Sequence, residues 1–310
     1  MSETDDDIAA ARALIAELGL LPDPASVPVA RLGGLTNRVY RVGAGENAVC
    51  FRFPGKGTET YIDRRVEVVA ARAAAKAGVS PEVIHADAGT GVLVTRFIPG
   101  ATTMTANGFA GNIGAAERAG RAFRQLHDSG AQFDFRFELF SMIDSYLGVL
   151  SSSDVRVPDG YAAVLSDAQL VRQALLSRPI PLAPCHCDPL AENFLDTGAR
   201  MWIVDWEYSG MNDPMWDLGD LSVEAALGEN EDNALLRAYF GGEPPQPARS
   251  RVIIYKAMCD LLWTLWGLIQ VANRNPADDF VAYSNLRFTR CRALMATTKF
   301  GDAVRVVASG

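Results

Sequence analysis

The chain has 310 residues, of which 49% are hydrophobic and 21% are charged, and its formal net charge is -8. This length and composition predict a globular protein with two domains or one bilobal unit and a substantial core. The negative charge argues against a general affinity for nucleic acid or anionic membranes, since both attract basic surfaces. It is compatible with a cationic substrate, and also with ordinary solvated acidic faces.

The cysteines and the apolar segments both indicate a cytoplasmic protein. Five cysteines without a CxxC spacing predict free thiols in a reducing compartment. The CHC run at 185–187 is a poor zinc site, because no second cluster completes a tetrahedral set. The N-terminus is acidic, unlike a secretory signal. Lys256 and Asp260 interrupt the longest apolar region, 252–272, so we expect a buried helix there.

The first hundred residues predict a small lobe of strands and one main helix. The segment IAAARALIAELGL has the pattern of a short amphipathic helix. From Val27 to Phe53, β-branched and aromatic residues with two glycine turns predict three antiparallel strands. Apolar residues at helical spacing follow over 61–78, with Gly78 as the expected cap. Residues 82–100 return to strands around a glycine-rich turn.

The remainder of the chain predicts a larger helical lobe. Helices are expected over 115–130, 137–150 and 161–177, and from Asp217 onward apart from a loop at 241–250. The only later strand signals are FLD and MWIVDW, which flank one turn. We therefore expect an α+β fold with an N-terminal lobe, residues 1–97, and a C-terminal lobe, residues 98–310.

Asp188, Asn193 and Asp205 form the most informative pattern in the sequence. Asp188 and Asn193 are five residues apart in HCDPLAEN, and Asp205 follows an apolar strand. Phosphoryl transfer needs a carboxylate near the acceptor hydroxyl and oxygen ligands for a magnesium ion on the nucleotide phosphates. Protein kinases space the same residue types in this way. The alternative is that these residues only cap helices or form turns, as Asp and Asn often do.

With these motifs, the chain resembles the choline/ethanolamine kinase family, in its bacterial form. That family lies within a superfamily of aminoglycoside phosphotransferases and protein-kinase-like enzymes. The segments that carry the resemblance span most of the chain: GGLTNRVYRV, RFPGKGTETYIDRRVE, RFIPG, HCDPLAENF, VDWEYSGMNDPMWDLGDL and LLWTLWGLIQ. The resemblance implies a bilobal protein-kinase-like fold with ATP and Mg²⁺ between the lobes. It also implies phosphorylation of choline or a related amino alcohol.

The resemblance implies a role for individual residues of the nucleotide site. Asp188 would be the catalytic base, and His186 would hold its loop. Magnesium would be bound by Asn193 and Asp205, with Glu207 assisting through water. Arg52 would contact the phosphates, with Glu67 as its ion-pair partner; the alternatives are a strand arginine that reaches solvent and a glutamate on a solvated helix face. Further nucleotide contacts are expected from Gly33, Gly34, Thr36, Asn37, the Arg96 carbonyl and the Ile98 amide. Asp217 is expected to be structural, and Asp213 a turn residue.

Four aromatic residues are the expected acceptor site. Tyr208, Trp263, Trp266 and Tyr283 would form a cage whose π faces hold a quaternary ammonium group, with Glu224 supplying negative charge. The alternative is that the two tryptophans, three residues apart on one helix, belong to the core. The AALGEN segment after Glu224 lacks the aromatics usual in the family, so ethanolamine or another amino alcohol stays open beside choline.

Two other functions stay open. An aminoglycoside kinase should have a wide, acidic acceptor site, and the paired tryptophans argue against it. A catalytically inactive nucleotide-binding module is the second alternative, although every expected polar position is filled. The sequence predicts no nucleic-acid partner and no membrane insertion, and it does not specify an oligomeric state.

Overall fold

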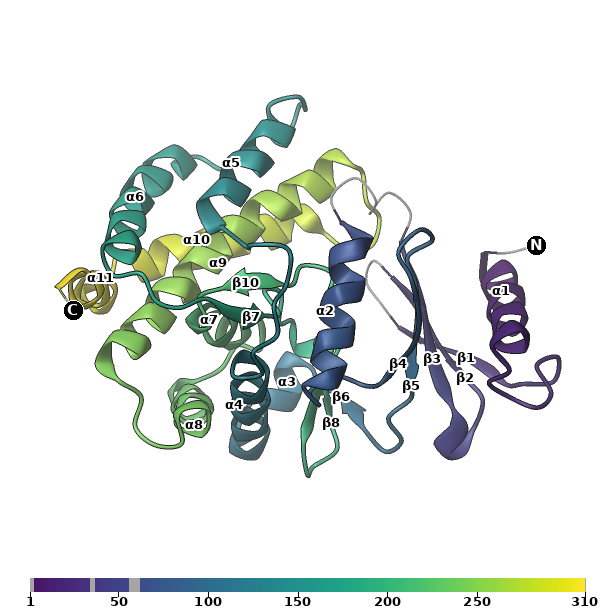
Figure 1. Cartoon of the computed structure of the whole chain (residues 1–310). Helices are drawn as coiled ribbons and strands as arrows, with labels where there is room; N and C mark the ends of the chain where they lie inside the picture. Colours follow the sequence, from purple (N-terminus) through teal and green to yellow (C-terminus); the bar gives the residue numbers. More distant parts are fainter. Residues whose placement is uncertain (1–2, 34–36, 56–61, 310) are drawn as a thin grey trace.

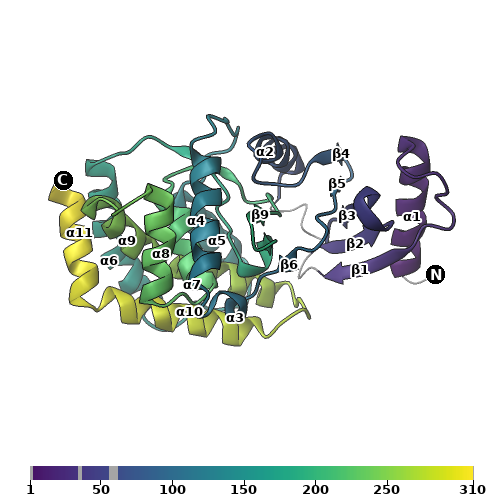
Figure 2. The same ribbon diagram turned by 90° about the horizontal axis from the view of Figure 1, so that it is seen from below.

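The fold is described from a computed structural model over residues 3–33, 37–55 and 62–309 (Figure 1). Gly34 and Thr36, two of the expected nucleotide contacts, lie outside the described residues. The N-terminal end of the chain lies beside a β-sheet, and the C-terminal end lies at the opposite extreme of the molecule, among helices (Figure 2).

A five-stranded antiparallel sheet, in the order β1-β2-β3-β5-β4, forms the N-terminal region. Its strands are β1 (Val29–Gly33), β2 (Arg38–Val42), β3 (Val49–Phe53), β4 (Val83–Asp87) and β5 (Val92–Arg96). The three strands expected between Val27 and Phe53 are therefore confirmed. Helix α1 (Glu3–Leu18) buries Ala11 and Ile15 against Tyr40 and Phe51 of the sheet, on the side away from the helical region (Figure 2).

Helix α2 (Arg64–Lys76) connects the sheet to the rest of the molecule. The Asp63 side chain caps it by accepting from the Arg65 amide, and Gly78 follows its end at a φ of +77°. The buried alanines of α2 pack into the core of the helical region rather than into the sheet core. This packing fixes the position of Glu67, on the same helix, relative to the C-terminal residues.

The C-terminal region is mostly helical, as expected. Its helices are α3 (Ala106–Phe109), α4 (Ile113–His127), α5 (Leu139–Leu150), α6 (Tyr161–Ser177), α7 (Met215–Glu224), α8 (Glu229–Phe240), α9 (Gln246–Ala272), α10 (Phe280–Met295) and α11 (Thr298–Ser309). Helix α9 is long and apolar enough to cross a membrane, but 83% of its most apolar window is buried inside the protein. Helices α5, α7, α10 and α11 pack around it, so α9 is the core helix of this region.

The described part of the C-terminal region also contains five short strands. They are β6 (Thr102–Thr103), β7 (Ala183–Cys185), β8 (Phe194–Asp196), β9 (Met201–Ile203) and β10 (Gly210–Asn212). The FLD and MWI strands are confirmed as β8 and β9. Strands β6, β7 and β10 were not predicted, because β6 has only two residues and the APC and GMN segments of β7 and β10 contain Pro, Gly and Asn, which are depleted in strands. The expected loop at 241–250 is wrong in its second half, since α9 begins at Gln246 and the first helical turn tolerates Pro247.

The antiparallel sheet followed by a helical region confirms the predicted α+β fold class. The boundary between the lobes, at residues 97 and 98, stays a prediction. It falls between β5 and β6, where the chain leaves the sheet.

Candidate functional site

Asp188 lies on a loop that a buried carboxylate holds in place. The Asp217 side chain, at the start of α7, accepts hydrogen bonds from the amides of His186 and Cys187, each at 2.8 Å. Cys187 has a φ of +68°, a conformation that is strained for a residue with a side chain. The two bonds to Asp217 stabilise this conformation and fix the backbone position of the next residue, Asp188. Asp217 is thus a structural residue, as expected.

His186 connects the same loop to Val204, the residue after strand β9. Its Nε2 donates to the Val204 carbonyl oxygen at 2.9 Å, and its Nδ1 accepts from the Asp188 amide at 3.4 Å. Burial lowers the pKa of His186, which favours this neutral form. The side chain therefore orients the loop and is not placed to react, in agreement with the expected role.

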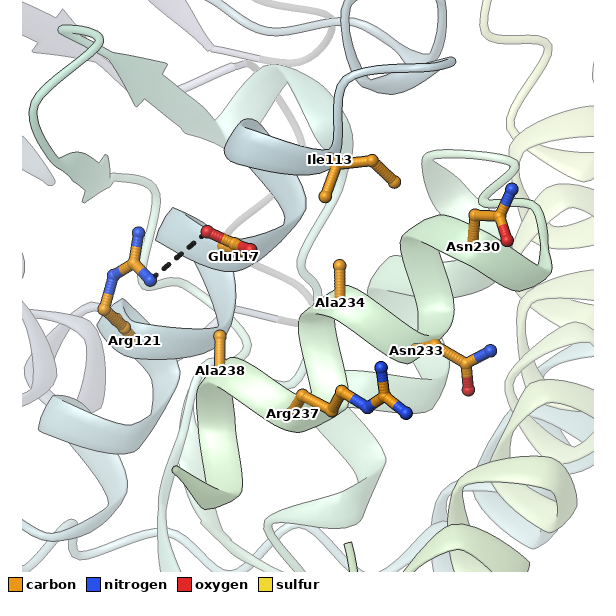
Figure 3. A pocket seen from close by; sticks show the side chains of 8 residues that line it. All are labelled: Ile113, Glu117, Arg121, Asn230, Asn233, Ala234, Arg237 and Ala238. Carbon is orange, nitrogen blue, oxygen red and sulfur yellow. Dashed lines mark ion pairs between the residues drawn. The ribbon is translucent and has the colours of Figure 1, made fainter. Parts of the chain in front are cut away.

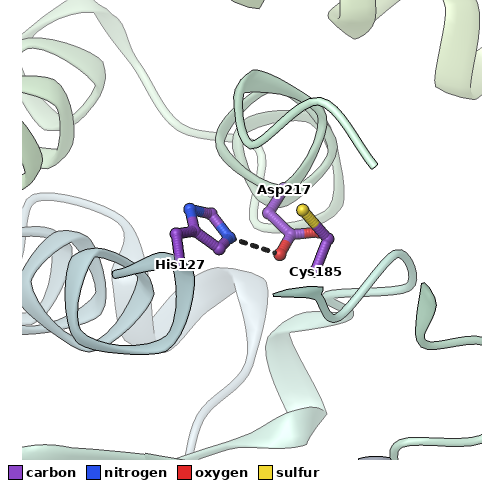
Figure 4. A group of neighbouring side chains, drawn as sticks. All are labelled: His127, Cys185 and Asp217. Carbon is purple, nitrogen blue, oxygen red and sulfur yellow. Dashed lines mark hydrogen bonds and ion pairs between the residues drawn. The ribbon is translucent and has the colours of Figure 1, made fainter. Parts of the chain in front are cut away.

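A buried polar chain continues from Asp217 into helices α4 and α8. His127, the last residue of α4, has its Nε2 at 2.9 Å from the Asp217 carboxylate (Figure 4). Its Nδ1 lies 3.0 Å from the hydroxyl of Tyr239, on α8. Cys185 lies beside Asp217, and its Sγ contacts the Asn212 carbonyl oxygen at 3.6 Å. Burial raises the pKa of the Cys185 thiol well above its usual value, which disfavours a thiolate ligand. These contacts show that the group supports the loop that carries Asp188.

The β8–β9 hairpin brings Asn193 next to Asp205. Asn193 ends a 3₁₀ turn before β8, and its carbonyl oxygen accepts from the Val204 amide at 2.9 Å. The Asn193 Nδ2 donates to the Asp188 carbonyl oxygen at 3.0 Å, which connects the two ends of the loop. Asp205 follows at a φ of +68°. The expected base and the two expected magnesium ligands therefore lie on adjoining turns.

Arg52 and Glu67 lie opposite this hairpin, on β3 and α2. They form a buried ion pair, and Arg52 also lies 3.3 Å from Asp205 and 3.5 Å from Glu207. These three carboxylates more than offset the burial of the guanidinium, so the pKa of Arg52 is raised. The ion pair between Arg52 and Glu67 is the one expected from the sequence. The contact of Arg52 with phosphate stays a prediction.

Two further residues contact the same carboxylates. Arg64 donates to Glu67 at 2.8 Å and to Glu207 at 3.0 Å, and it was not identified from the sequence. Its spacing of three residues from Glu67 on a helix was the signal that could have indicated the pair. Asn37 donates to Glu207 at 3.2 Å and to Asp205 at 3.4 Å. Asn37 is therefore at the site, next to the expected metal ligands.

Several carboxyl groups of this site are held close together. Glu67, Asp205 and Glu207 place their oxygen atoms within 4.8 Å of one another. Burial, and then the charge of Asp205, raises the pKa of Glu207 to about 7. Burial, and then the charges of Glu224 and Asp205, raises the pKa of Asp188. Hard oxygen donors gathered in this way fit a magnesium ion, whose charge would relieve their repulsion.

The remaining expected nucleotide contacts lie along the sheet. Gly33 ends β1. Arg96 ends β5, where its amide donates to the Glu82 carbonyl oxygen at 2.9 Å and its side chain pairs with Glu82 at the surface. Ile98 follows in the connection to β6. Arg96 and Ile98 therefore lie where the chain leaves the sheet. Their contact with adenine stays a prediction.

The four expected aromatic residues, Tyr208, Trp263, Trp266 and Tyr283, contact one another. Trp266 donates from Nε1 to the Tyr208 hydroxyl at 3.0 Å and has its ring centroid 5.7 Å from that of Tyr283. Tyr208 and Trp263 pack edge to face at 5.5 Å. Gly267 permits this arrangement, because a Cβ there would lie 2.7 Å from the Tyr283 ring. The side chains form one cluster from α9, α10 and the turn after β9.

Glu224 lies near this cluster but already has a cationic partner. Arg287, one turn after Tyr283 on α10, pairs with Glu224 at 2.6 Å and lies 4.4 Å from the centre of the Tyr283 ring. Arg287 was not identified from the sequence. A second carboxylate, Asp220, lies one turn before Glu224 on α7 and accepts from Trp263 Nε1 at 3.3 Å. Its spacing of four residues from Glu224 places both carboxylates on one face of α7, and this could have identified Asp220 from the sequence.

Two hollows of the surface lie away from these residues. One, of about 550 Å³, lies between α4 and α8 and is lined by Ile113, Glu117, Arg121, Asn230, Asn233, Ala234, Arg237 and Ala238 (Figure 3). Another, of about 430 Å³, lies beside α2 and Trp202. Neither contains Asp188, Asp205 or Glu207. The carboxylates of the polar site are instead held by the ion pairs of Arg52 and Arg64.

Comparison with known proteins identifies relatives over nearly the whole chain. Residues 29–252 match the phosphotransferase enzyme family. A choline/ethanolamine kinase family protein from Mesorhizobium loti is 59% identical, with a TM-score of 0.87 over 98% of this chain and 100% of that one. Choline kinase LicA from Streptococcus pneumoniae is 26% identical, with a TM-score of 0.78 over 95% of this chain and 99% of that one. A LicA structure in complex with AMP is also 26% identical.

A curated relative agrees with these structures. Protein LicA from Haemophilus influenzae is 27% identical over 247 residues, which is 78% of this chain and 73% of that protein. The match of fold and sequence over most of the chain confirms the resemblance that the motifs indicated.

Proposed function

Because this chain belongs to the choline/ethanolamine kinase family of phosphotransferases, we propose that it transfers the terminal phosphoryl group of ATP to the hydroxyl of choline or a closely related amino alcohol. The observation that carries the proposal is the position of Asp188. Its loop adjoins Asn193 and Asp205 through hydrogen bonds, and its charge interacts with Glu224, beside the aromatic cluster. These contacts support a role for Asp188 between the proposed phosphate-binding residues and the proposed acceptor residues.

The reaction follows from these positions. Asp188 takes the proton of the acceptor hydroxyl, the hydroxyl oxygen attacks the terminal phosphorus, and ADP leaves. Asn193, Asp205 and Glu207 would hold Mg²⁺, which when bound supplies positive charge to the phosphate oxygens. Arg52, oriented by Glu67, contacts the same phosphates with its planar guanidinium. The aromatic cluster positions the amino alcohol so that its hydroxyl faces Asp188.

The acceptor is the part of the proposal that an assay decides. The test is a measurement of ADP release with choline, ethanolamine and kanamycin at equal concentrations. We expect turnover with at least one of the two amino alcohols and none with kanamycin, because the aromatic residues leave few carboxylates free for several ammonium groups. Preferred turnover of kanamycin would contradict the proposal. Thermal stabilisation by ATP and Mg²⁺, without ADP release with any acceptor, would instead indicate an inactive nucleotide-binding module.

A further inference from the structure

Asp220 is a fully buried carboxylate at the edge of the aromatic cluster. Its exposed fraction is 0%, and its two oxygens accept from Trp263 Nε1 at 3.3 and 3.4 Å. Among residues 3–33, 37–55 and 62–309, no ion pair of Asp220 within 4 Å is found. A buried carboxylate with one neutral donor is costly, so its place beside a proposed cation site requires an explanation.

The neighbouring acids differ from Asp220 in having cations. Glu224 pairs with Arg287 at 2.6 Å, and Asp260 pairs with Arg287 at 3.2 Å and with Arg290 at 2.5 Å. Arg287 therefore matches the charge of Glu224 before any substrate binds. Burial, and then the charges of Glu224 and Asp188, raises the pKa of Asp220, as expected for acids gathered without enough cations. A cationic ligand in the cluster would remove this imbalance.

Asp220 could influence such a ligand through its hydrogen bond with Trp263. The indole N–H points to the carboxylate, and the second indole N–H, that of Trp266, is bound by Tyr208. With both N–H groups engaged, a ligand meets the π faces and carbon edges of these rings. A negative charge at the indole N–H also raises the electron density of the ring, which strengthens its attraction for a cation.

We propose that Asp220, acting through the Trp263 indole, is the positioning residue that gives the acceptor site its preference for a cationic amino alcohol. This inference rests on the proposed function and assigns to Asp220 the charge that the sequence had assigned to Glu224. It makes Asp220 more than an anchor for Trp263, because a neutral acceptor of the same shape would anchor the indole equally well. The two roles are separated by removing the charge and keeping the hydrogen bond.

The decisive variant is Asp220→Asn, whose Oδ1 still accepts from the indole. It is assayed with choline and its uncharged analogue 3,3-dimethyl-1-butanol, and with ethanolamine and its analogue 1-propanol, each alcohol as a substrate and as a competitive inhibitor. We expect the KM of the cationic acceptor to rise about tenfold, with less than about a twofold change for the neutral analogue and for ATP. Asp144→Asn, on the exposed face of α5, is the matched control for loss of one acid and should change none of them.

The outcomes distinguish the inference from the function on which it rests. Turnover of an amino alcohol with equal changes for charged and neutral acceptors, or with no change at all, overturns the role of Asp220 alone. Absence of turnover with every amino alcohol overturns the proposed function too. If Asp220→Asn does not fold, Trp263→Phe keeps an aromatic ring and removes the N–H. An unchanged ratio of charged to neutral acceptor in that variant would equally contradict the proposal.

Discussion

Arg52 and Glu67 form a buried ion pair that joins strand β3 to helix α2, with side-chain exposures of 8% and 3%. The pair is part of a larger group, because Arg52 also contacts Asp205 and Arg64 joins Glu67 to Glu207. The sheet, helix α2 and the turn after β9 are therefore connected through charged side chains. Truncating one member of such a group leaves buried charges without partners.

Glu67→Gln should weaken the use of ATP more than the use of the acceptor. Without the Glu67 charge, the remaining partners of Arg52 are the Gly91 carbonyl oxygen and the carboxylates of Asp205 and Glu207, which are expected to bind the metal. We expect the kcat/KM for ATP to fall by about 10- to 100-fold, equivalent to about 1.4–2.7 kcal/mol. Steady-state kinetics with ATP varied at saturating acceptor measures this. Glu82→Gln, which breaks an exposed pair with Arg96, is the control, and equal losses in both variants would contradict the role of Glu67.

Asp188→Ala should abolish most turnover and leave nucleotide binding largely intact. General-base catalysis contributes at least about 100-fold to such reactions, so kcat should fall by that factor or more. The loop should keep its shape, since its bonds to Asp217 come from the amides of His186 and Cys187. Turnover and ATP-dependent thermal shift measured on the same preparation check both parts. A variant with wild-type turnover would remove Asp188 from the mechanism.

The spacing of Asp188, Asn193 and Asp205 was enough to predict how they meet. Each lies within a few residues of a short strand or turn, so local geometry fixes its position. Arg64 lies three residues before Glu67 on α2, a local spacing that could have indicated their pair, whereas Arg287 was missed for a physical reason. Arg287 meets Glu224 across 63 residues, and no local pattern encodes which of many arginines is buried. Ion pairs between distant elements depend on helix packing, which a single sequence does not specify.

In the expected acceptor site too, local spacing was predictable and contacts between distant elements were not. The spacing of Trp263 and Trp266 predicted that they share a helix face, and they do meet Tyr208 and Tyr283. The sequence did not predict which carboxylate lacks a cation, because Asp220 and Glu224 lie one turn apart on the same helix, α7. Only the packing of α10 against α9 brings Arg287 to Glu224 and leaves Asp220 to the indole.

Glu138 provides a test of pH dependence in the helical region. It caps α5 by accepting from the Ser141 amide at 2.8 Å and the Ser141 hydroxyl at 2.6 Å. Burial alone would raise the pKa of Glu138, but the bonds from Ser141 lower it below its usual 4.5. The stability that it adds is therefore present above pH 4.5 and is lost as the pH falls through the lowered value.

Glu138→Ala should accordingly reduce the free energy of unfolding by about 1 kcal/mol at pH 7, as for other N-caps. The difference from the wild type should shrink as the pH falls below 4.5. Urea unfolding of both proteins at pH 7 and at pH 3.5 measures it. Ser151→Ala, at the other end of α5, is the control, since no titration is involved. A difference that stays constant with pH would show that the charge of Glu138 does not stabilise the cap.

Gly267→Ala should damage the acceptor site selectively. Helices α9 and α10 approach closely at Gly267, where a Cβ would lie 2.7 Å from the Tyr283 ring and would also meet the Ser284 hydroxyl. The ring and helix α10 must shift to admit the methyl group, which separates Tyr283 from Trp266. We expect the KM of the amino alcohol to rise about tenfold and stability to fall by about 1–3 kcal/mol, as for other overpacked sites.

The KM of ATP should change little in this variant, because its expected contacts lie in the N-terminal sheet region, on α2 and around the β8–β9 hairpin, and none of them lies on α9 or α10. Gly148→Ala on α5, where a Cβ meets nothing within 4 Å, is the matched control and should leave both KM values and the melting temperature nearly unchanged. Kinetics with each substrate varied in turn, together with thermal melts, give both quantities. If Gly267→Ala raised the two KM values equally, the helix α9–α10 contact would serve general packing and not the acceptor.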